Sequence, residues 1–189
     1  MGIVVLIVFA LAVVIAVGYV VGIYNQLVQV KVNVDKSWAN IDVLEKQRYD
    51  EIPKLVQVCE GYMQYERDTL QKVIEARTKY LQAQGPGEKG AASSQMAGAL
   101  KSLFALAESY PDLKANQNFA QLQTRITALE NEIADRREFY NDSVTINNAR
   151  IQQIPYAFFA AMLSMREREM YKVSAVEKNA PEIKFAYPR

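Results

Sequence analysis

Histidine is absent from the 189-residue sequence, and cysteine occurs only once, at Cys59. Without histidine the chain cannot build a Ser-His-Asp triad, a Cys-His pair, a two-histidine zinc helix or the Glu-x-x-His iron sites of many four-helix bundles. A single cysteine excludes an internal disulfide and a cysteine-rich zinc site. We therefore expect no metal and no cofactor, and we interpret Cys59 as a small core residue.

An excess of charge of one sign is also lacking. The 22 Lys and Arg residues are interleaved with 21 Asp and Glu residues, and the formal net charge is +1. Nucleic-acid binding requires basic residues gathered on one surface, so nucleic acid is not an expected partner. Apolar residues make up 50% of the chain and charged residues 23%, which is typical of a globular or membrane-attached protein.

No charged side chain precedes Lys31, and the run from Ile3 to Ile23 consists of aliphatic residues and Phe with only glycine and tyrosine between them. As a helix these residues would extend about 31 Å, which is the hydrocarbon thickness of a bilayer. The run is too long for a cleaved signal peptide and lacks a basic leading segment. The sequence predicts a retained transmembrane anchor over 1–24, with the lipid bilayer as partner, and one helical domain over 25–189.

Lys31 and Lys36 follow the span closely, whereas its leading flank carries only the terminal amine. With this single span, the positive-inside rule then predicts that the helical domain lies in the cytoplasm. Gly18 and Gly22 form a G-x-x-x-G pair, which permits close packing of two membrane helices. Glycine is also common in membrane spans for other reasons, so the pair is a candidate packing site only.

Apolar residues at intervals of three and four predict long amphipathic helices after the anchor. The first stripe continues straight out of the membrane, and Pro53 predicts a kink or a new helix. The second stripe predicts a helix over 52–81, the Gly-rich segment 84–90 predicts a loop, and a shorter helix ends before Pro111. The stripes are Leu27, Val30, Val34, Trp38, Ile41 and Leu44, then Ile52, Leu55, Val56, Cys59, Tyr62, Met63, Leu70, Val73, Ile74 and Leu81, then Met96, Leu100, Leu103, Phe104 and Ala107.

The longest stripe runs from Phe119 to Ile151, with Asn116 or Asn118 as the helix cap. Its later half carries polar residues on the same face, which predicts either a buried polar network or the edge of the core. Together the stripes predict an all-α fold: a transmembrane helix followed by an up-and-down antiparallel four-helix bundle. A coiled-coil homodimer is the competing interpretation, because the seam extends over several heptads.

Residues 154–165 form an apolar stretch that is too short to span a bilayer. We expect it to contact the membrane surface or a neighbouring subunit, or alternatively to cap the open end of the bundle. The candidate contact residues are Tyr156, Phe158, Phe159, Met162 and Leu163. The last ten residues, 180–189, are expected to be extended.

Several motifs along the chain resemble the LemA family. They are Tyr24-Asn25-Gln26-Leu27-Val28, Val34-Asp35-Lys36-Ser37-Trp38, Arg48-Tyr49-Asp50, Tyr110-Pro111-Asp112-Leu113-Lys114-Ala115-Asn116 and Phe139-Tyr140-Asn141-Asp142. The resemblance covers roughly residues 20 to 185, and it departs from the family pattern in the apolar stretch near Phe158 and Phe159. It implies an N-terminally anchored bacterial membrane protein with a four-helix bundle and a relative in magnetosome membranes. It implies no activity and no catalytic residues.

These observations favour a non-catalytic structural or interaction protein that forms a homo-oligomer or scaffolds an unidentified protein at the membrane. A regulatory adaptor of another membrane protein is the second hypothesis, and it predicts a defined heteromeric complex. An enzyme is the third. Its candidate residues are Glu130, Glu132, Asp135, Arg136 and Tyr140, although such residues at helical spacing are usually solvated or satisfied by neighbours.

Overall fold

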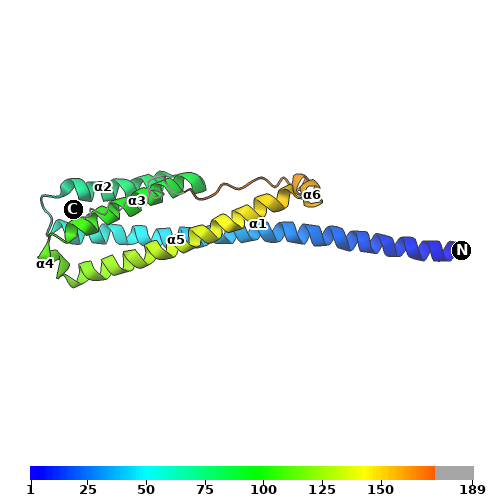
Figure 1. The fold of residues 1–189 in the computed structure, drawn as a ribbon, viewed down its shortest axis with the longest axis horizontal. Coiled ribbons are helices and arrows are strands. Elements are labelled where there is room, and N and C mark those ends of the chain that lie inside the picture. Colours follow the sequence, from blue (N-terminus) through cyan, green and yellow to red (C-terminus); the bar gives the residue numbers. More distant parts are fainter. Residues whose placement is uncertain (173–189) are drawn as a thin grey trace, which may run out of the picture. The chain divides into compact units, whose positions relative to one another are not determined.

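The computed structural model describes residues 1–172, and helices are the only regular elements in that range (Figure 1). The expectation of an all-α fold is therefore confirmed for this part of the chain. The helices are α1 Gly2–Glu60, α2 Arg67–Gln82, α3 Gly85–Ala107, α4 Pro111–Lys114, α5 Gln117–Gln152 and α6 Tyr156–Met162. The expectation for the tail 180–189 lies outside the described residues.

The chain forms two compact units, and α1 and α5 contribute residues to both. The first unit consists of Met1–Asp42 and Asp135–Glu169. The second consists of Val43–Ala134 and Met170–Arg189, of which the structure describes residues up to Lys172.

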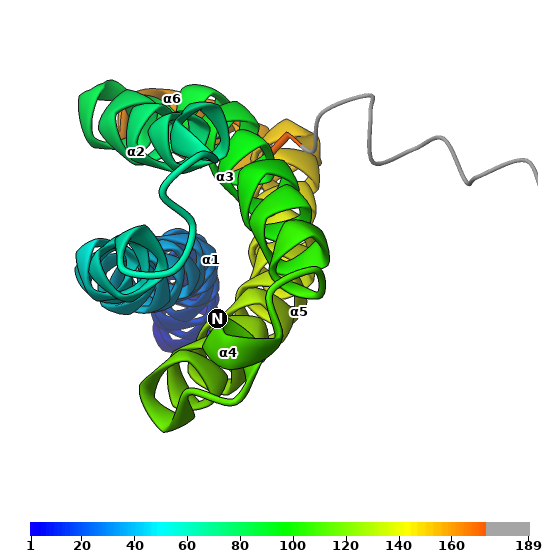
Figure 2. The ribbon, with the colours of Figure 1, turned by 90° about the vertical axis from the view of Figure 1, so that its left-hand side faces the viewer.

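In the second unit, α1, α2, α3 and α5 all contribute to one apolar core. Within this unit α2 and α3 lie side by side, as both views show (Figures 1 and 2). The core gathers every fully buried member of the sequence stripes between Ile52 and Ile126, including Cys59. Burial raises the pKa of the Cys59 thiol to about 11, so the thiol is protonated near neutral pH, as expected of a core residue.

In the first unit, the early part of α1 packs on the later part of α5 in antiparallel order. Ser37 and Ser143 share a hydrogen bond of 3.1 Å, and the rings of Trp38 and Tyr140 lie 5.4 Å apart. Nearer the N-terminal apolar run, Arg150 donates to Gln26 at 2.8 Å. On the later half of the α5 seam, Tyr140, Ser143 and Asn147 are buried, whereas Arg136 and the contact between Arg150 and Gln26 are exposed. Buried polar residues and the edge of the core therefore both occur along this seam.

The N-terminal apolar run and the first amphipathic stripe form one continuous helix, as expected, but Pro53 does not begin a new helix. It lies inside α1, which ends only at Glu60. Proline removes the bond that residue 53 would otherwise donate to the carbonyl of Tyr49. Arg77 from α2 donates its Nε–H to that carbonyl at 3.2 Å. This long-range hydrogen bond satisfies the carbonyl that Pro53 leaves free.

The prediction of one helix over 52–81 is wrong, because residues 61–66 form a turn between α1 and α2. Met63 lies in this turn and is nevertheless fully buried in the same core as Cys59. The chain reverses while its apolar residues keep the four-residue spacing of a helix. The apolar periodicity therefore gives no indication that the helix ends, and Gly61 is the one residue nearby that favours a turn.

The predicted loop over 84–90 is also wrong for most of its length, because α3 already begins at Gly85. Gly85 has a φ of 73°, a conformation that glycine adopts without strain, and Pro86 fits the first helical turn. Only Ala83 and Gln84 separate α2 from α3. In contrast, the expected end before Pro111 and the expected long helix α5 are confirmed, and Asn116 Oδ1 caps α5 by accepting from the backbone N–H groups of Asn118 and Phe119.

Gly90 in α3 allows a very close approach of residues 171 and 172 within the second unit. A Cβ atom at position 90 would lie 2.5 Å from the carbonyl oxygen of Lys172 and 3.0 Å from Cδ1 of Tyr171. Such distances force the backbone of the 171–172 segment to shift. At Gly98, which lies eight residues further along α3, a Cβ atom would meet nothing within 4 Å.

We therefore predict opposite effects of alanine at these two glycines. Gly90→Ala should lower the free energy of unfolding by about 1–3 kcal/mol, because overpacking outweighs the gain in helix propensity. Gly98→Ala is the matched control and should raise it by about 0.5–1 kcal/mol. Thermal unfolding of the full chain in detergent, followed by circular dichroism, measures both. Equal stabilisation by the two substitutions would contradict the close contact at Gly90.

Candidate functional site

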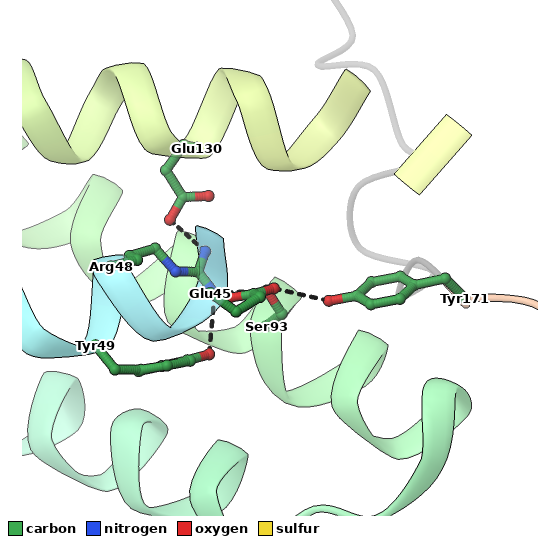
Figure 3. Close-up of polar contacts among 6 residues, drawn as sticks. All are labelled: Glu45, Arg48, Tyr49, Ser93, Glu130 and Tyr171. Carbon is green, nitrogen blue, oxygen red and sulfur yellow. Dashed lines mark hydrogen bonds and ion pairs between the residues drawn. The ribbon is translucent and has the colours of Figure 1, made fainter. Parts of the chain in front are cut away.

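A cluster of six polar residues lies inside the second unit, and we call it the Arg48 cluster. Its members are Glu45, Arg48, Tyr49, Ser93, Glu130 and Tyr171 (Figure 3). They come from α1, α3, α5 and the segment that follows residue 169, so the cluster joins parts of the chain that are far apart in sequence. The guanidinium of Arg48 lies at its centre.

Arg48 is bonded on several sides. Its Nη1 donates to Glu130 Oε1 at 2.5 Å, and its Nη2 donates to Tyr49 Oη at 3.0 Å and to Ser93 Oγ at 2.6 Å. Nη2 also forms an ion pair with Glu45 Oε2. The second oxygen of Glu45 accepts from Ser93 Oγ at 2.5 Å and from Tyr171 Oη at 2.9 Å. Each carboxylate thus has a cation or hydroxyl partner.

The centre of the cluster is closed to solvent, and Glu130 lies at its edge. The side chains of Arg48 and Glu45 are 0% exposed, and that of Glu130 is 23% exposed. Burial alone would lower the pKa of Arg48, but the carboxylates of Glu45 and Glu130 raise it above its ordinary value. Burial likewise raises the pKa of Tyr49, and the cation of Arg48 only partly offsets this. The guanidinium therefore stays charged and the phenol stays neutral near pH 7.

This arrangement suits a structural role. The charges are held in a dry interior, where breaking one partner leaves the other buried and uncompensated. Arg48 cannot give up its proton, and Tyr49 holds its own more strongly than a free phenol does. Within residues 1–172, no group of three or more His, Cys, Asp or Glu residues is placed to hold a metal ion.

The candidate catalytic residues are divided between the two compact units. Glu130 is bound to Arg48. Tyr140 donates to the carbonyl oxygen of Glu169 at 2.9 Å, and its ring is tilted by 55° to that of Trp38. Glu132, Asp135 and Arg136 are exposed on the surface of α5. Glu130 and Glu132 belong to the second unit, whereas the other three belong to the first.

The candidate membrane-packing residues Gly18 and Gly22 have open space where a side chain would be. Among the candidate contact residues, Tyr156 and Phe159 are partly buried and pack with Ala160 against Ile23 and Leu27. Phe158, Met162 and Leu163 instead expose 69%, 81% and 43% of their surface. The short helix α6 thus has one face on α1 and one apolar face without cover from the described residues.

Sequence reasoning missed the Arg48 cluster as a site, although it gave one signal. Glu45 and Arg48 each follow a buried stripe residue, Ile41 and Leu44, by four positions. Charged residues at core-facing positions of a helix indicate a buried pair. Ser93 and Tyr171 lie 48 and 126 residues from Glu45, so no local spacing identifies them.

Known proteins resemble this chain over most of its length. The LemA family model matches residues 37–185. Protein LemA of Metamycoplasma hominis is 28% identical over 162 residues, which cover 84% of this chain and 73% of that protein. Magnetosome proteins MamQ 2 and MamQ 1 of Paramagnetospirillum magneticum are each 21% identical over 175 residues. The match to each magnetosome protein covers 79% of this chain and 64% of that protein, which is less than two thirds of its length.

The fold defines the class of protein. Among residues 1–172, α1 is the one helix that is long and apolar enough to cross a membrane, and the other described elements are helical as well, so the findings indicate an all-helical, membrane-associated protein. The chain belongs to the LemA family, as the sequence resemblance predicted.

The cluster predicts a large asymmetry between single and paired substitutions. Arg48→Met leaves Glu45 buried without its cation and should cost about 3–5 kcal/mol, whereas Arg48→Met with Glu45→Leu should cost much less. Alkylation of Cys59, the single cysteine, reports opening of this core because the thiol is fully buried. Arg48→Met should accelerate alkylation of the native chain by at least about a hundredfold.

Lys46→Met is the matched control for this experiment, because Lys46 forms an exposed ion pair with Asp50 on the same helix. Exposed pairs contribute little, so this variant should be alkylated at the wild-type rate. Equal rates for Arg48→Met and Lys46→Met would show that the Arg48 cluster does not hold the core together.

Proposed function

We propose that the protein is a non-catalytic structural protein that self-assembles at the inner membrane of a bacterial cell, with its helical domain in the cytoplasm. The observation that carries this proposal is that the first part of α1 is apolar and exposed, whereas the rest of α1 packs against protein. Residues 1–21 are exposed without exception and carry no charged side chain, whereas the same helix from Ile23 onward contributes buried residues to both compact units. Lys31 and Lys36 support the cytoplasmic orientation.

In this proposal residues 1–24 are the anchor and residues 25–189 form an up-and-down antiparallel four-helix bundle. The shared core of α1, α2, α3 and α5 in the second unit supports the bundle. The antiparallel pairing of α1 with α5 in the first unit supports it as well. Short connections such as residues 83–84 between α2 and α3 favour antiparallel neighbours.

A non-catalytic role is supported by the chemistry of the polar residues. The buried charges of the Arg48 cluster bind one another, and the candidate catalytic carboxylates are divided between the two units. Catalytic acids and bases require a partner and a substrate-accessible position together. A structural or interaction role requires neither.

Self-assembly is supported by the open faces of the anchor and of α6. Gly18 and Gly22 lie one turn apart on α1, and nothing covers them among residues 1–172. The exposed face of α6, with Phe158 and Met162, offers an apolar contact for the membrane or a neighbouring subunit. Two relatives are named as magnetosome proteins, and by analogy we propose that this chain organises a membrane surface through homo-oligomers.

The proposal predicts that bulky residues at the two glycines weaken the oligomer. Gly18→Leu with Gly22→Leu should shift the chain in detergent toward monomer, because side chains at both positions keep the helix backbones apart. Ala16→Leu is the matched control, since 100° per residue puts it on the far side of the helix from the glycine pair. Light scattering coupled to size exclusion measures the molecular mass.

A wild-type chain that is monomeric in detergent at every concentration would contradict self-assembly. If chemical crosslinking in cells then captured a single foreign membrane protein at constant stoichiometry, the regulatory adaptor would be the better description. An equal loss of oligomer in Ala16→Leu would show that the Gly18 and Gly22 face is not the contact.

A further inference from the structure

A hollow of about 290 Å³ lies in the first unit, and we call it the Lys31 hollow. Lys31 of α1, Asn147 of α5 and the chain segment 163–168 line it. All of these residues belong to one compact unit. The volume is at the lower limit of small-ligand sites, so it suits a small headgroup better than a drug-sized molecule.

The segment that forms one wall of this hollow is firmly held to α5. The side-chain amide of Asn148 donates to the carbonyl oxygen of Arg168 at 2.9 Å and accepts from its backbone N–H at 2.8 Å. Gln152 donates to Glu167 at 2.8 Å. These contacts come from successive turns of α5, and they give the hollow a preformed wall.

The charge in the Lys31 hollow is unbalanced. Arg168 forms an ion pair with Asp35, with 3.0 Å between Nη2 and Oδ1. Lys31 and Arg166 form no hydrogen bond or ion pair with any residue in 1–172. The lining therefore carries three cations, Lys31, Arg166 and Arg168, and one carboxylate, Glu167. Because Asp35 neutralises Arg168, the two unengaged cations are available to an anionic ligand.

The hollow lies next to the apolar surface that the proposed function assigns to the membrane. α6 directly precedes the 163–168 segment and packs on Ile23 and Leu27, at the end of the membrane-spanning run. Lys31 follows Leu27 by four residues, which is about 6 Å along the helix. Helical side chains tilt toward the helix N-terminus, so Lys31 leans toward the bilayer. Leu163 belongs to both surfaces, because it lines the hollow and exposes 43% of its area.

We propose that the Lys31 hollow binds the phosphate-bearing headgroup of an anionic glycerophospholipid. Lys31 and Arg166 contact the phosphate, while the exposed face of α6, from Phe158 to Met162, lies against the acyl chains of the same leaflet. The ligand is a membrane lipid because the cations adjoin an exposed apolar face and the end of the span. The inference rests on the proposed function to the extent that α1 anchors the chain in a bilayer.

The test uses the full chain reconstituted in nanodiscs of phosphatidylcholine, with or without phosphatidylglycerol. Native mass spectrometry after release into detergent measures how much phosphatidylglycerol stays bound. Lys31→Gln with Arg166→Gln should reduce the apparent affinity for phosphatidylglycerol roughly 30-fold, because each cation near a membrane surface contributes a factor of about five. Lys31→Arg with Arg166→Lys keeps both charges and should retain binding.

Lys72→Gln with Lys101→Gln is the matched control, since it removes two exposed lysines from the other unit. It should bind phosphatidylglycerol as the wild type does. Slow alkylation of Cys59 in every variant verifies that the chain is folded. Equal losses in the two double-Gln variants, or equal retention of phosphatidylcholine and phosphatidylglycerol by the wild type, would overturn the inference.

A second experiment adds soluble anions, inorganic phosphate or glycerol 1-phosphate, to the chain with bound phosphatidylglycerol. Neither should displace phosphatidylglycerol at concentrations comparable to the lipid. Displacement that depends on Lys31 and Arg166 would identify the hollow as a site for a free anion and contradict the lipid assignment. A chain that does not enter nanodiscs at all would instead contradict the anchor, and therefore the proposed function, so the two failures are distinguishable.

Discussion

The structure depends on a contrast along α1 between an exposed apolar run at its start and a continuation that packs against protein. Residues 1–21 are apolar and exposed, whereas Ile23, Leu27 and later stripe residues of the same helix are buried by protein. Exposed apolar surface of this extent is unfavourable in water and favourable in a bilayer. In the proposed function, the point near Ile23 where protein contacts begin fixes the level of the first unit at the membrane, and that proposal puts α6 and the Lys31 hollow at the same level.

Further along the same helix, the Arg48 cluster determines which segments meet in the second unit. Dry ion pairs add little net stability, because desolvation offsets the attraction between the charges. They are nevertheless selective, because a buried carboxylate without its partner is strongly unfavourable. Glu45 is satisfied only when Arg48, Ser93 and Tyr171 all contact it. Glu130 forms its ion pair with Arg48. We interpret the cluster as the feature that sets the register of α1, α3, α5 and the chain beyond residue 169.

Local patterns predicted the parts of the fold that local physics controls. The apolar run of α1, the long stripe of α5 and the cap at Asn116 are examples, because periodicity and side-chain capping act over a few residues. The errors lie where distant residues decide. Arg77 satisfies the carbonyl freed by Pro53, Met63 keeps the core spacing across a turn, and Gly90 serves a segment some 80 residues away. The Lys31 hollow also depends on distant segments, and no sequence spacing brings Lys31 near Arg166.

Extraction of membranes with alkaline carbonate tests the central claim most directly, because it releases peripheral proteins and leaves spanning helices in place. The full chain should remain in the membrane fraction, and so should a variant whose residues 2–21 are replaced by an equal length of leucine and alanine. Deletion of residues 2–21 should release a helical protein in which Cys59 is still slowly alkylated. Release of the full chain by carbonate, or retention of the deletion variant, would contradict the account.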